Sequence, residues 1–119
     1  MARLLVVDDE RDILDLLVRR LREDGHDVLS ADCGDTALSL VRAHGLPDAV
    51  VLDIDMPGLD GFELLDSLRR TDPGLRAVFV TALWAEDVAE RIRAHAALHV
   101  AKPFTGAGLK AAVREVLAV

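Results

Sequence analysis

The run Ala49–Leu52, which ends at Asp53, constrains the fold of this chain more than any other stretch. It holds no polar residue, and a short unbroken apolar run bounded by turn residues is typical of a parallel strand buried on both faces. Proline and glycine follow within residues 57–61 and predict turns. A carboxylate therefore stands where a buried strand stops. Open α/β sheets bind ligands at that edge, although an aspartate there can also simply open a turn.

Other short apolar runs repeat this pattern and alternate with stretches of helical periodicity. The predicted strands cover residues 4–7, 27–31, 48–53, 77–81 and 98–101. The predicted helices lie between residues 10 and 24, between 34 and 45, and over 61–70, 85–96 and 105–117. In the first helix, the residues at helical spacing that are predicted to face the core are Ile13, Leu16, Leu17 and Leu21. Strict alternation of strands and helices predicts an α/β domain, a parallel sheet with helices on both faces.

Composition narrows the class of protein. Of the 119 residues, 51% are apolar, which favours one domain over residues 1–119 with a single core. The net charge of −7 argues against direct nucleic-acid binding by this domain. Cys33 is the single cysteine, so an intrachain disulfide is excluded and a reducing compartment fits. The first apolar run is too short for a signal peptide and no segment reaches the length of a membrane span, so we expect a cytoplasmic protein with no membrane partner.

Polar side chains stand at the carboxyl ends of four of the five predicted strands. They are Asp8 and Asp9 after the first strand, Asp53 after the third, Thr81 after the fourth and Lys102 after the fifth. Parallel strands place these ends on one edge of the sheet. The sequence therefore predicts a cleft lined by three carboxylates, one hydroxyl and one ammonium group.

This set of groups suits phosphoryl transfer. Three neighbouring carboxylates repel one another, and a hard cation such as Mg²⁺ relieves the repulsion because it prefers oxygen ligands. A carboxylate can also act as a nucleophile and carry an aspartyl phosphate, here on Asp53. Thr81 supplies a hydrogen-bond donor and Lys102 a positive charge for the transferred group. Taken singly, the acidic pair could cap a helix, Thr81 could belong to a turn and Lys102 could be a solvated loop lysine; their joint placement favours a site.

Four segments, taken in order, resemble motifs of the receiver domain of bacterial two-component response regulators, of the chemotaxis-regulator type. Residues 5–10 (LVVDDE) resemble the acidic-pair motif, and residues 52–61 (LDIDMPGLDG) resemble the phosphoacceptor motif. Residues 81–82 resemble the signalling-hydroxyl motif and residues 102–104 (KPF) the lysine motif. The resemblance covers essentially the whole chain. It implies a doubly wound, flavodoxin-like (βα)5 fold with a five-stranded parallel sheet in the order 2-1-3-4-5.

The resemblance also implies a metal site. Asp53 would accept a phosphoryl group from a sensor histidine kinase or a phosphotransfer protein. Asp9 and Asp53 would ligate Mg²⁺ directly, together with the backbone carbonyl of Asp55, and Asp8 would act through water. Asp55 and Leu83 occupy positions that flank the phosphorylation pocket, where Asp55 could orient water and Leu83 could hinder it.

The resemblance further implies how the switch works. Lys102 would pair with the phosphoryl oxygens from a cis Lys102–Pro103 peptide, and Thr81 would move to bond the phosphoryl group. The signal would leave through the face formed by the fourth helix, fifth strand and fifth helix. His99 stands where the family usually has a switching tyrosine or phenylalanine; its flat, pH-sensitive ring can play that part or be an ordinary half-buried strand residue. Trp84 borders this face, either exposed as an interface residue or packed on Ile92.

The predicted function is therefore a phosphorylation-controlled signalling switch and not an enzyme, with at most weak self-phosphorylation from small donors and self-dephosphorylation. Its partners would be the kinase and a downstream output domain or target protein, and a phosphorylation-dependent homodimer is compatible with this function. Two alternatives stay open. One is a haloacid-dehalogenase-like phosphatase that uses Asp53 and Asp55, and the other is a degenerate receiver that binds partners without phosphorylation.

Overall fold

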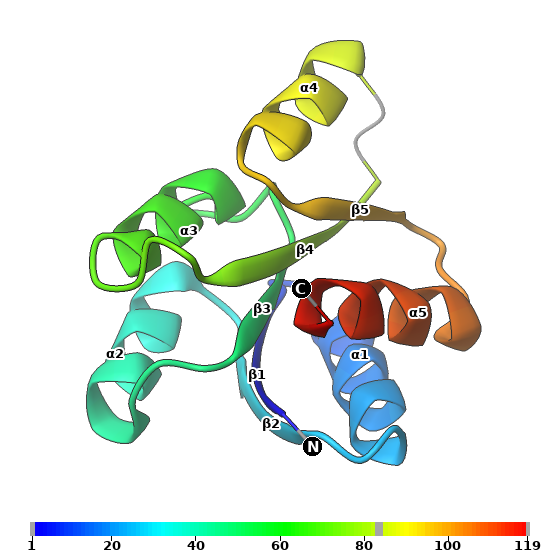
Figure 1. Ribbon diagram of the computed structural model, residues 1–119, viewed down its shortest axis with the longest axis horizontal. Helices are drawn as coiled ribbons and strands as arrows, with labels where there is room; N and C mark the ends of the chain where they lie inside the picture. Colours follow the sequence, from blue (N-terminus) through cyan, green and yellow to red (C-terminus); the bar gives the residue numbers. More distant parts are fainter. Residues whose placement is uncertain (1, 83–84, 119) are drawn as a thin grey trace.

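The computed structural model describes residues 2–82 and 85–118. Over these residues a central parallel sheet carries helices on both faces (Figure 1). The strands are β1 (Arg3–Val7), β2 (Asp27–Ala31), β3 (Ala49–Leu52), β4 (Arg76–Thr81) and β5 (Leu98–Ala101). The helices are α1 (Arg11–Glu23), α2 (Gly34–His44), α3 (Gly61–Arg69), α4 (Glu86–Ala94) and α5 (Gly106–Leu117). The strand order β2-β1-β3-β4-β5 confirms the expected doubly wound, flavodoxin-like topology.

The unbroken apolar strands are explained by the two layers of helices. Helices α1 and α5 cover one face of the sheet, and α2, α3 and α4 cover the other (Figure 1). Alternate residues of each strand point to opposite faces. Val50 and Leu52 of β3 join the core under α2 and α3, whereas Ala49 and Val51 join the core under α1 and α5. A strand with a hydrophobic layer on each side has no position for a polar side chain until it ends.

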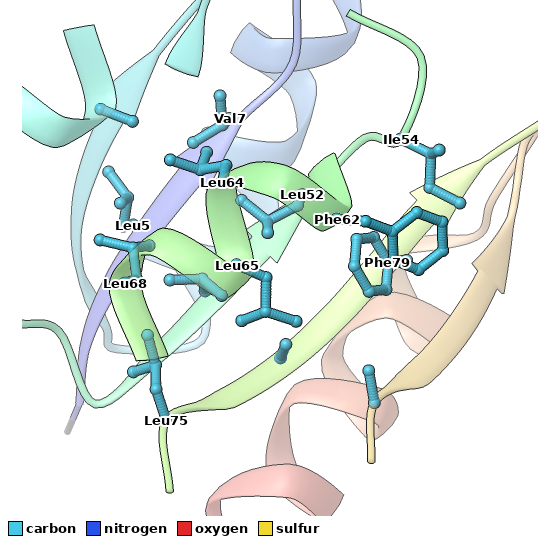
Figure 2. Close-up of a cluster of buried hydrophobic side chains, with 14 of the residues drawn as sticks. Leu5, Val7, Leu52, Ile54, Phe62, Leu64, Leu65, Leu68, Leu75 and Phe79 are labelled. Atoms are coloured by element: carbon cyan, nitrogen blue, oxygen red, sulfur yellow. The ribbon is translucent and has the colours of Figure 1, made fainter. Parts of the chain in front are cut away.

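Phe62 and Phe79 lie next to each other at one end of the larger core, near Ile54 (Figure 2). Their ring centroids lie 4.8 Å apart, with the planes tilted by 46°. The guanidinium carbon of Arg91 lies 4.1 Å from the centre of the Phe62 ring, so α4 adds a cation–π contact to this end of the core. Two of the chain's few aromatic residues thus pack in the core between the sheet and the helices α3 and α4.

Two sequence-based predictions about helices need correction. The buried residues of α1 are Leu14, Leu17, Val18 and Leu21, whereas the predicted Ile13 and Leu16 are only partly buried. The apolar arc of this helix is wide, and packing against β2 and α5 decides which part of it is covered. The fourth helix ends at Ala94, two residues before the predicted end, because Ala96 takes a left-handed conformation with φ of 50° and turns the chain into β5.

None of the described helices combines the length and the apolar character needed to cross a membrane.

Candidate functional site

Lys102 lies at the centre of the carboxyl edge of the sheet. Its Nζ lies 2.9 Å from Oδ2 of Asp8, 3.1 Å from Oδ2 of Asp53 and 3.3 Å from Oε1 of Glu10. Asp8 follows β1, Asp53 follows β3 and Lys102 follows β5, so the fold brings together three groups that lie far apart in the sequence. The Lys102–Pro103 peptide is cis, as predicted.

The backbone orients both buried carboxylates toward this lysine. Oδ1 of Asp8 accepts a hydrogen bond from the backbone N–H of Glu10 at 2.9 Å, and Oδ1 of Asp53 accepts one from the backbone N–H of Ile54 at 2.8 Å. In each case the other oxygen, Oδ2, faces Lys102. One oxygen of each group is thus held by the loop, and the second is directed into the site.

Burial sets the electrostatics of the site. Asp8 is fully buried, with no exposed area, and Asp53 is 6% exposed. Burial raises the pKa of both carboxyl groups above the ordinary value, because desolvation disfavours the ionised form, and Lys102 only partly opposes this effect. Burial works against the charged form of Lys102 as well, but the two carboxylates outweigh it and raise the pKa of the lysine. One ammonium group therefore stabilises two desolvated carboxylates.

The same carboxylates form a group that can hold a cation. Asp8, Glu10 and Asp53 each offer one carboxylate oxygen, and these oxygens all lie within 4.8 Å of one another. A hard divalent ion prefers such oxygen donors, and excess negative charge beside a single lysine fits its binding. Glu10 was missed as a site residue by sequence reasoning. The signal for it was the run of three consecutive acidic residues that begins at Asp8.

Asp9 and Asp55 occupy a different position from these three residues. Both are exposed, and among the described residues neither belongs to the group of converging carboxylates. Asp9 immediately follows Asp8, and Asp55 lies two residues after Asp53 in the loop that leads to α3. Direct ligation of Mg²⁺ by Asp9 and by the backbone carbonyl of Asp55 stays a prediction.

Thr81 is buried beside the lysine. It ends β4, pairs with Ala101 of β5, and its backbone carbonyl accepts a hydrogen bond of 3.0 Å from the N–H of Lys102. His99 is half-buried on β5 and pairs with Phe79. Its neighbours Leu98 and Val100 pack on the core under α1 and α5, so strand alternation places His99 on the face that carries α4. The switching roles of Thr81 and His99 stay predictions, and Leu83 and Trp84 lie outside the described residues.

Gly61 allows the loop after Asp53 to close tightly onto α3. A Cβ on Gly61 would lie 2.1 Å from the backbone oxygen of Asp53, and the Gly61 N–H donates to the carbonyl of Ile54 at 2.9 Å. Asp60 and Glu63 form a reciprocal capping box that starts α3 at this point. The site's central carboxylate is therefore positioned by a close backbone contact that only glycine allows.

Known proteins match both the sequence and the fold. The family description "response regulator receiver domain" matches residues 4–114. A response regulator receiver protein of Anaeromyxobacter is 42% identical over 100 residues, which are 84% of this chain and 42% of that protein. The response regulator MprA of Mycobacterium is 42% identical over 119 residues, which are 98% of this chain and 50% of that protein. The chain thus spans about half the length of these curated relatives.

A solved structure agrees with these matches. The Vibrio cholerae chemotaxis protein CheY4 superposes with a TM-score of 0.89 at 26% identity, over 98% of this chain and 99% of that one. The superposition therefore covers nearly the whole of this chain. Fold, motifs and site geometry point to one family: this chain belongs to the response regulator receiver domains, which are phosphorylation-controlled signalling switches.

Proposed function

We propose that Asp53 is the phosphoacceptor of this receiver domain and that its donor is the phosphohistidine of a sensor kinase or a phosphotransfer protein. The observation that carries the proposal is the position of Asp53 Oδ2, which is nearly buried and lies 3.1 Å from Nζ of Lys102. In this reaction a carboxylate oxygen of Asp53 attacks phosphorus, and the bond from phosphorus to the donor nitrogen breaks. The electron pair of that bond returns to the nitrogen, which takes up a proton.

Lys102 acts both before and after the phosphoryl transfer. Before transfer it stabilises the desolvated carboxylates of Asp8 and Asp53. After transfer it is close enough to pair with a phosphoryl oxygen on Asp53, because charge-assisted hydrogen bonds have similar lengths for carboxylate and phosphate acceptors. The lysine therefore changes partner without leaving the site.

Mg²⁺ fits the same edge. Asp8, Glu10 and Asp53 offer converging oxygens, and the family resemblance adds Asp9 and the backbone carbonyl of Asp55. When bound, the ion supplies positive charge to the carboxylates and to the phosphoryl oxygens. The raised pKa of the two buried carboxyl groups supports this assignment, since negative charge is in excess there without a second cation.

The output of the switch is proposed to leave through α4, β5 and α5. Thr81 ends β4 beside the site, and its backbone bond to Lys102 connects it to β5, which carries His99. An output domain or target protein, or a second phosphorylated copy, would read this face, and the chain would act in the cytoplasm. Enzymatic activity would be limited to self-phosphorylation from small donors and self-dephosphorylation; a phosphatase built on Asp53 and Asp55 is not favoured.

Labelling with a small donor tests the phosphoacceptor. With acetyl phosphate and Mg²⁺ we expect intact mass spectrometry to show one added phosphoryl group, and peptide mapping to place it on Asp53. Asp53→Asn abolishes the label, whereas the matched control Asp55→Asn keeps it, because Asp55 is exposed and its proposed contribution is a backbone carbonyl. A label on Asp8 or Thr81 with Asp53 unmodified, or equal labelling after chelation of Mg²⁺, would contradict the proposal. Tight partner binding that persists unchanged in Asp53→Asn would favour the degenerate receiver.

Amide chemical shifts test the output face. Saturation with a phosphoryl mimic is expected to move the amides of β5 (Leu98–Ala101) and of α4 and α5 more than those of α2 (Gly34–His44). The reason is that Thr81 pairs with β5 and Lys102 directly follows β5, whereas α2 packs against β2 at the opposite edge of the sheet. Changes confined to α2 would contradict the proposed route.

A further inference from the structure

A cavity of about 390 Å³ opens at the amino end of the sheet, at the opposite end of the strands from Asp53. It lies where β1 and β2 begin and where α1 and α2 end. The apolar part of its lining includes Leu5, Leu29, Val41 and Pro47; we call it the floor of the cavity. The volume is in the range of sites that hold small organic ligands, which are mostly apolar with a few placed polar groups.

The rim of this cavity is basic, although the chain as a whole carries a net charge of −7. Arg3, Arg22 and His44 line it, with Asp27 as its acidic member. Nη2 of Arg3 donates to the His44 carbonyl at 2.7 Å, and Nη2 of Arg22 donates to the Val28 carbonyl at 3.1 Å. Each guanidinium is thus held in place by one nitrogen and keeps further N–H groups of its planar fork, whose geometry suits a carboxylate.

His26 adds a buried donor to the wall of the cavity. Its side chain is 9% exposed, and its Nδ1 accepts a hydrogen bond of 3.3 Å from the backbone N–H of Ala2. A backbone N–H can only donate, so the neutral ring carries its proton on Nε2. Within the described residues that Nε2 has no hydrogen-bond partner, and the Oδ2 atom of Asp24 lies 3.8 Å away, beyond hydrogen-bond distance. A buried donor of this kind is costly to leave unpaired, and His26 is among the residues that line the cavity.

We propose that this cavity binds a small amphiphilic carboxylate, a monoanion with an apolar body. The body would rest on Leu5, Leu29 and Val41, and the carboxylate would pair with Arg3 and Arg22 at the rim. Inorganic phosphate fits less well, because it has no apolar part for the floor and its second charge is disfavoured by Asp27. The site is separate from the phosphoacceptor, so it does not depend on the function proposed for Asp53.

Titration with sodium octanoate tests the site, with amide shifts as the readout. We expect saturable shifts at Leu5, Leu29 and Val41, and weaker binding by octanol, which has the same chain without the charge. Arg22→Gln should raise the dissociation constant about tenfold, the effect of losing one charge-assisted contact. Arg19→Gln is the matched control: it lies on the same helix, is exposed, and is not part of the cavity.

A second variant keeps the test independent of the arginine. Val41→Phe places extra volume in the cavity from the partly buried face of α2 and should reduce octanoate binding while the amide spectrum stays that of a folded protein. The proposal is overturned if octanoate gives no saturable shifts at millimolar concentrations, or if octanol binds as tightly as octanoate. It is also overturned if Arg22→Gln and Arg19→Gln weaken binding equally, or if Val41→Phe binds like the unaltered chain.

Discussion

Replacement of Lys102 by methionine is expected to destabilise the metal-free protein by about 3 kcal/mol at neutral pH, the lower end of the cost of breaking a buried ion pair. The substitution keeps an unbranched side chain of nearly the same length and removes its charge. Asp8 and Asp53 then stay desolvated without the ammonium group that lies 2.9 Å and 3.1 Å from their oxygens. The lower end applies because the lysine also reaches Glu10, whose side chain is 63% exposed, so the mouth of the site admits solvent.

The loss of stability caused by Lys102→Met should depend on pH in a defined direction. Burial already raises the pKa of Asp8 and of Asp53, and removal of Lys102 raises both pKa values further. A carboxyl group with a raised pKa binds its proton more tightly in the folded state, so folding gains stability as the pH falls through that folded pKa toward the ordinary value of 3.8. The destabilisation caused by Lys102→Met should therefore be largest at neutral pH and shrink under mildly acidic conditions.

Urea denaturation in the presence of a chelator measures this effect. The free energy of unfolding is compared at pH 7.5 and at pH 5 for the unaltered chain, Lys102→Met and Lys110→Met. Lys110 is the only other lysine in the chain and has no ion pair among the described residues. Its replacement should change the stability by no more than about 0.5 kcal/mol.

Two results would refute this reasoning. Equal destabilisation by Lys102→Met and Lys110→Met would show that the buried carboxylates do not depend on their neighbouring cation. A loss for Lys102→Met that stays constant or grows as the pH falls would show that the carboxylates are not the source of the cost.

Further substitutions test the supports of the site, with the midpoint of urea denaturation as the common measurement. Gly61→Ala should lower the free energy of unfolding by about 3 kcal/mol because the new Cβ would lie 2.1 Å from a backbone oxygen. Gly74→Ala, where the nearest atom lies 3.8 Å from the new Cβ, should be close to neutral. Similar losses for the two variants would contradict the close-contact argument. Asp60→Ala removes the N-terminal cap of α3 and should lower the free energy of unfolding by about 1 kcal/mol, and Asp60→Ser should recover part of this loss. An unchanged stability in Asp60→Ala would mean that the capping box does not stabilise the helix. Arg69→Ala leaves the backbone carbonyls of Leu75 and His95 without their guanidinium donor and should lower the free energy of unfolding by about 2 kcal/mol. The control Arg70→Ala removes an exposed side chain and should have a much smaller effect. Equal effects would disprove the stabilising role of Arg69.

The strand ends were predictable from the sequence because their signals are local. An unbroken apolar run marks a strand with hydrophobic layers on both sides, and the first polar residue after it marks the end of burial. Parallel strands share one carboxyl edge, so Asp8, Asp53, Thr81 and Lys102 could be placed together without coordinates. The same reasoning predicted the strand order only through the family resemblance, since alternation by itself does not order the strands.

Only the tertiary structure decided which members of the acidic run enter the site. Asp8 is fully buried and still donates its backbone N–H to the Ala31 carbonyl of β2, Asp9 is exposed, and Glu10, just before α1, is within reach of Lys102. Three consecutive carboxylates look alike in a sequence. Their roles separate at the junction of strand and helix, where the backbone direction changes from one residue to the next.

Packing between distant segments likewise determined which side of α1 is buried, where α4 ends and how the basic cavity forms. Val18 replaces Leu16 in the core because β2 and α5 cover that side of α1. The cavity draws its lining from two strands, two helix ends and the loop after α2, and Arg3 and His44 meet there across 41 positions of the chain. Local patterns determine where elements and polar strand ends lie, but burial depends on which surfaces meet, and that is a property of the whole fold.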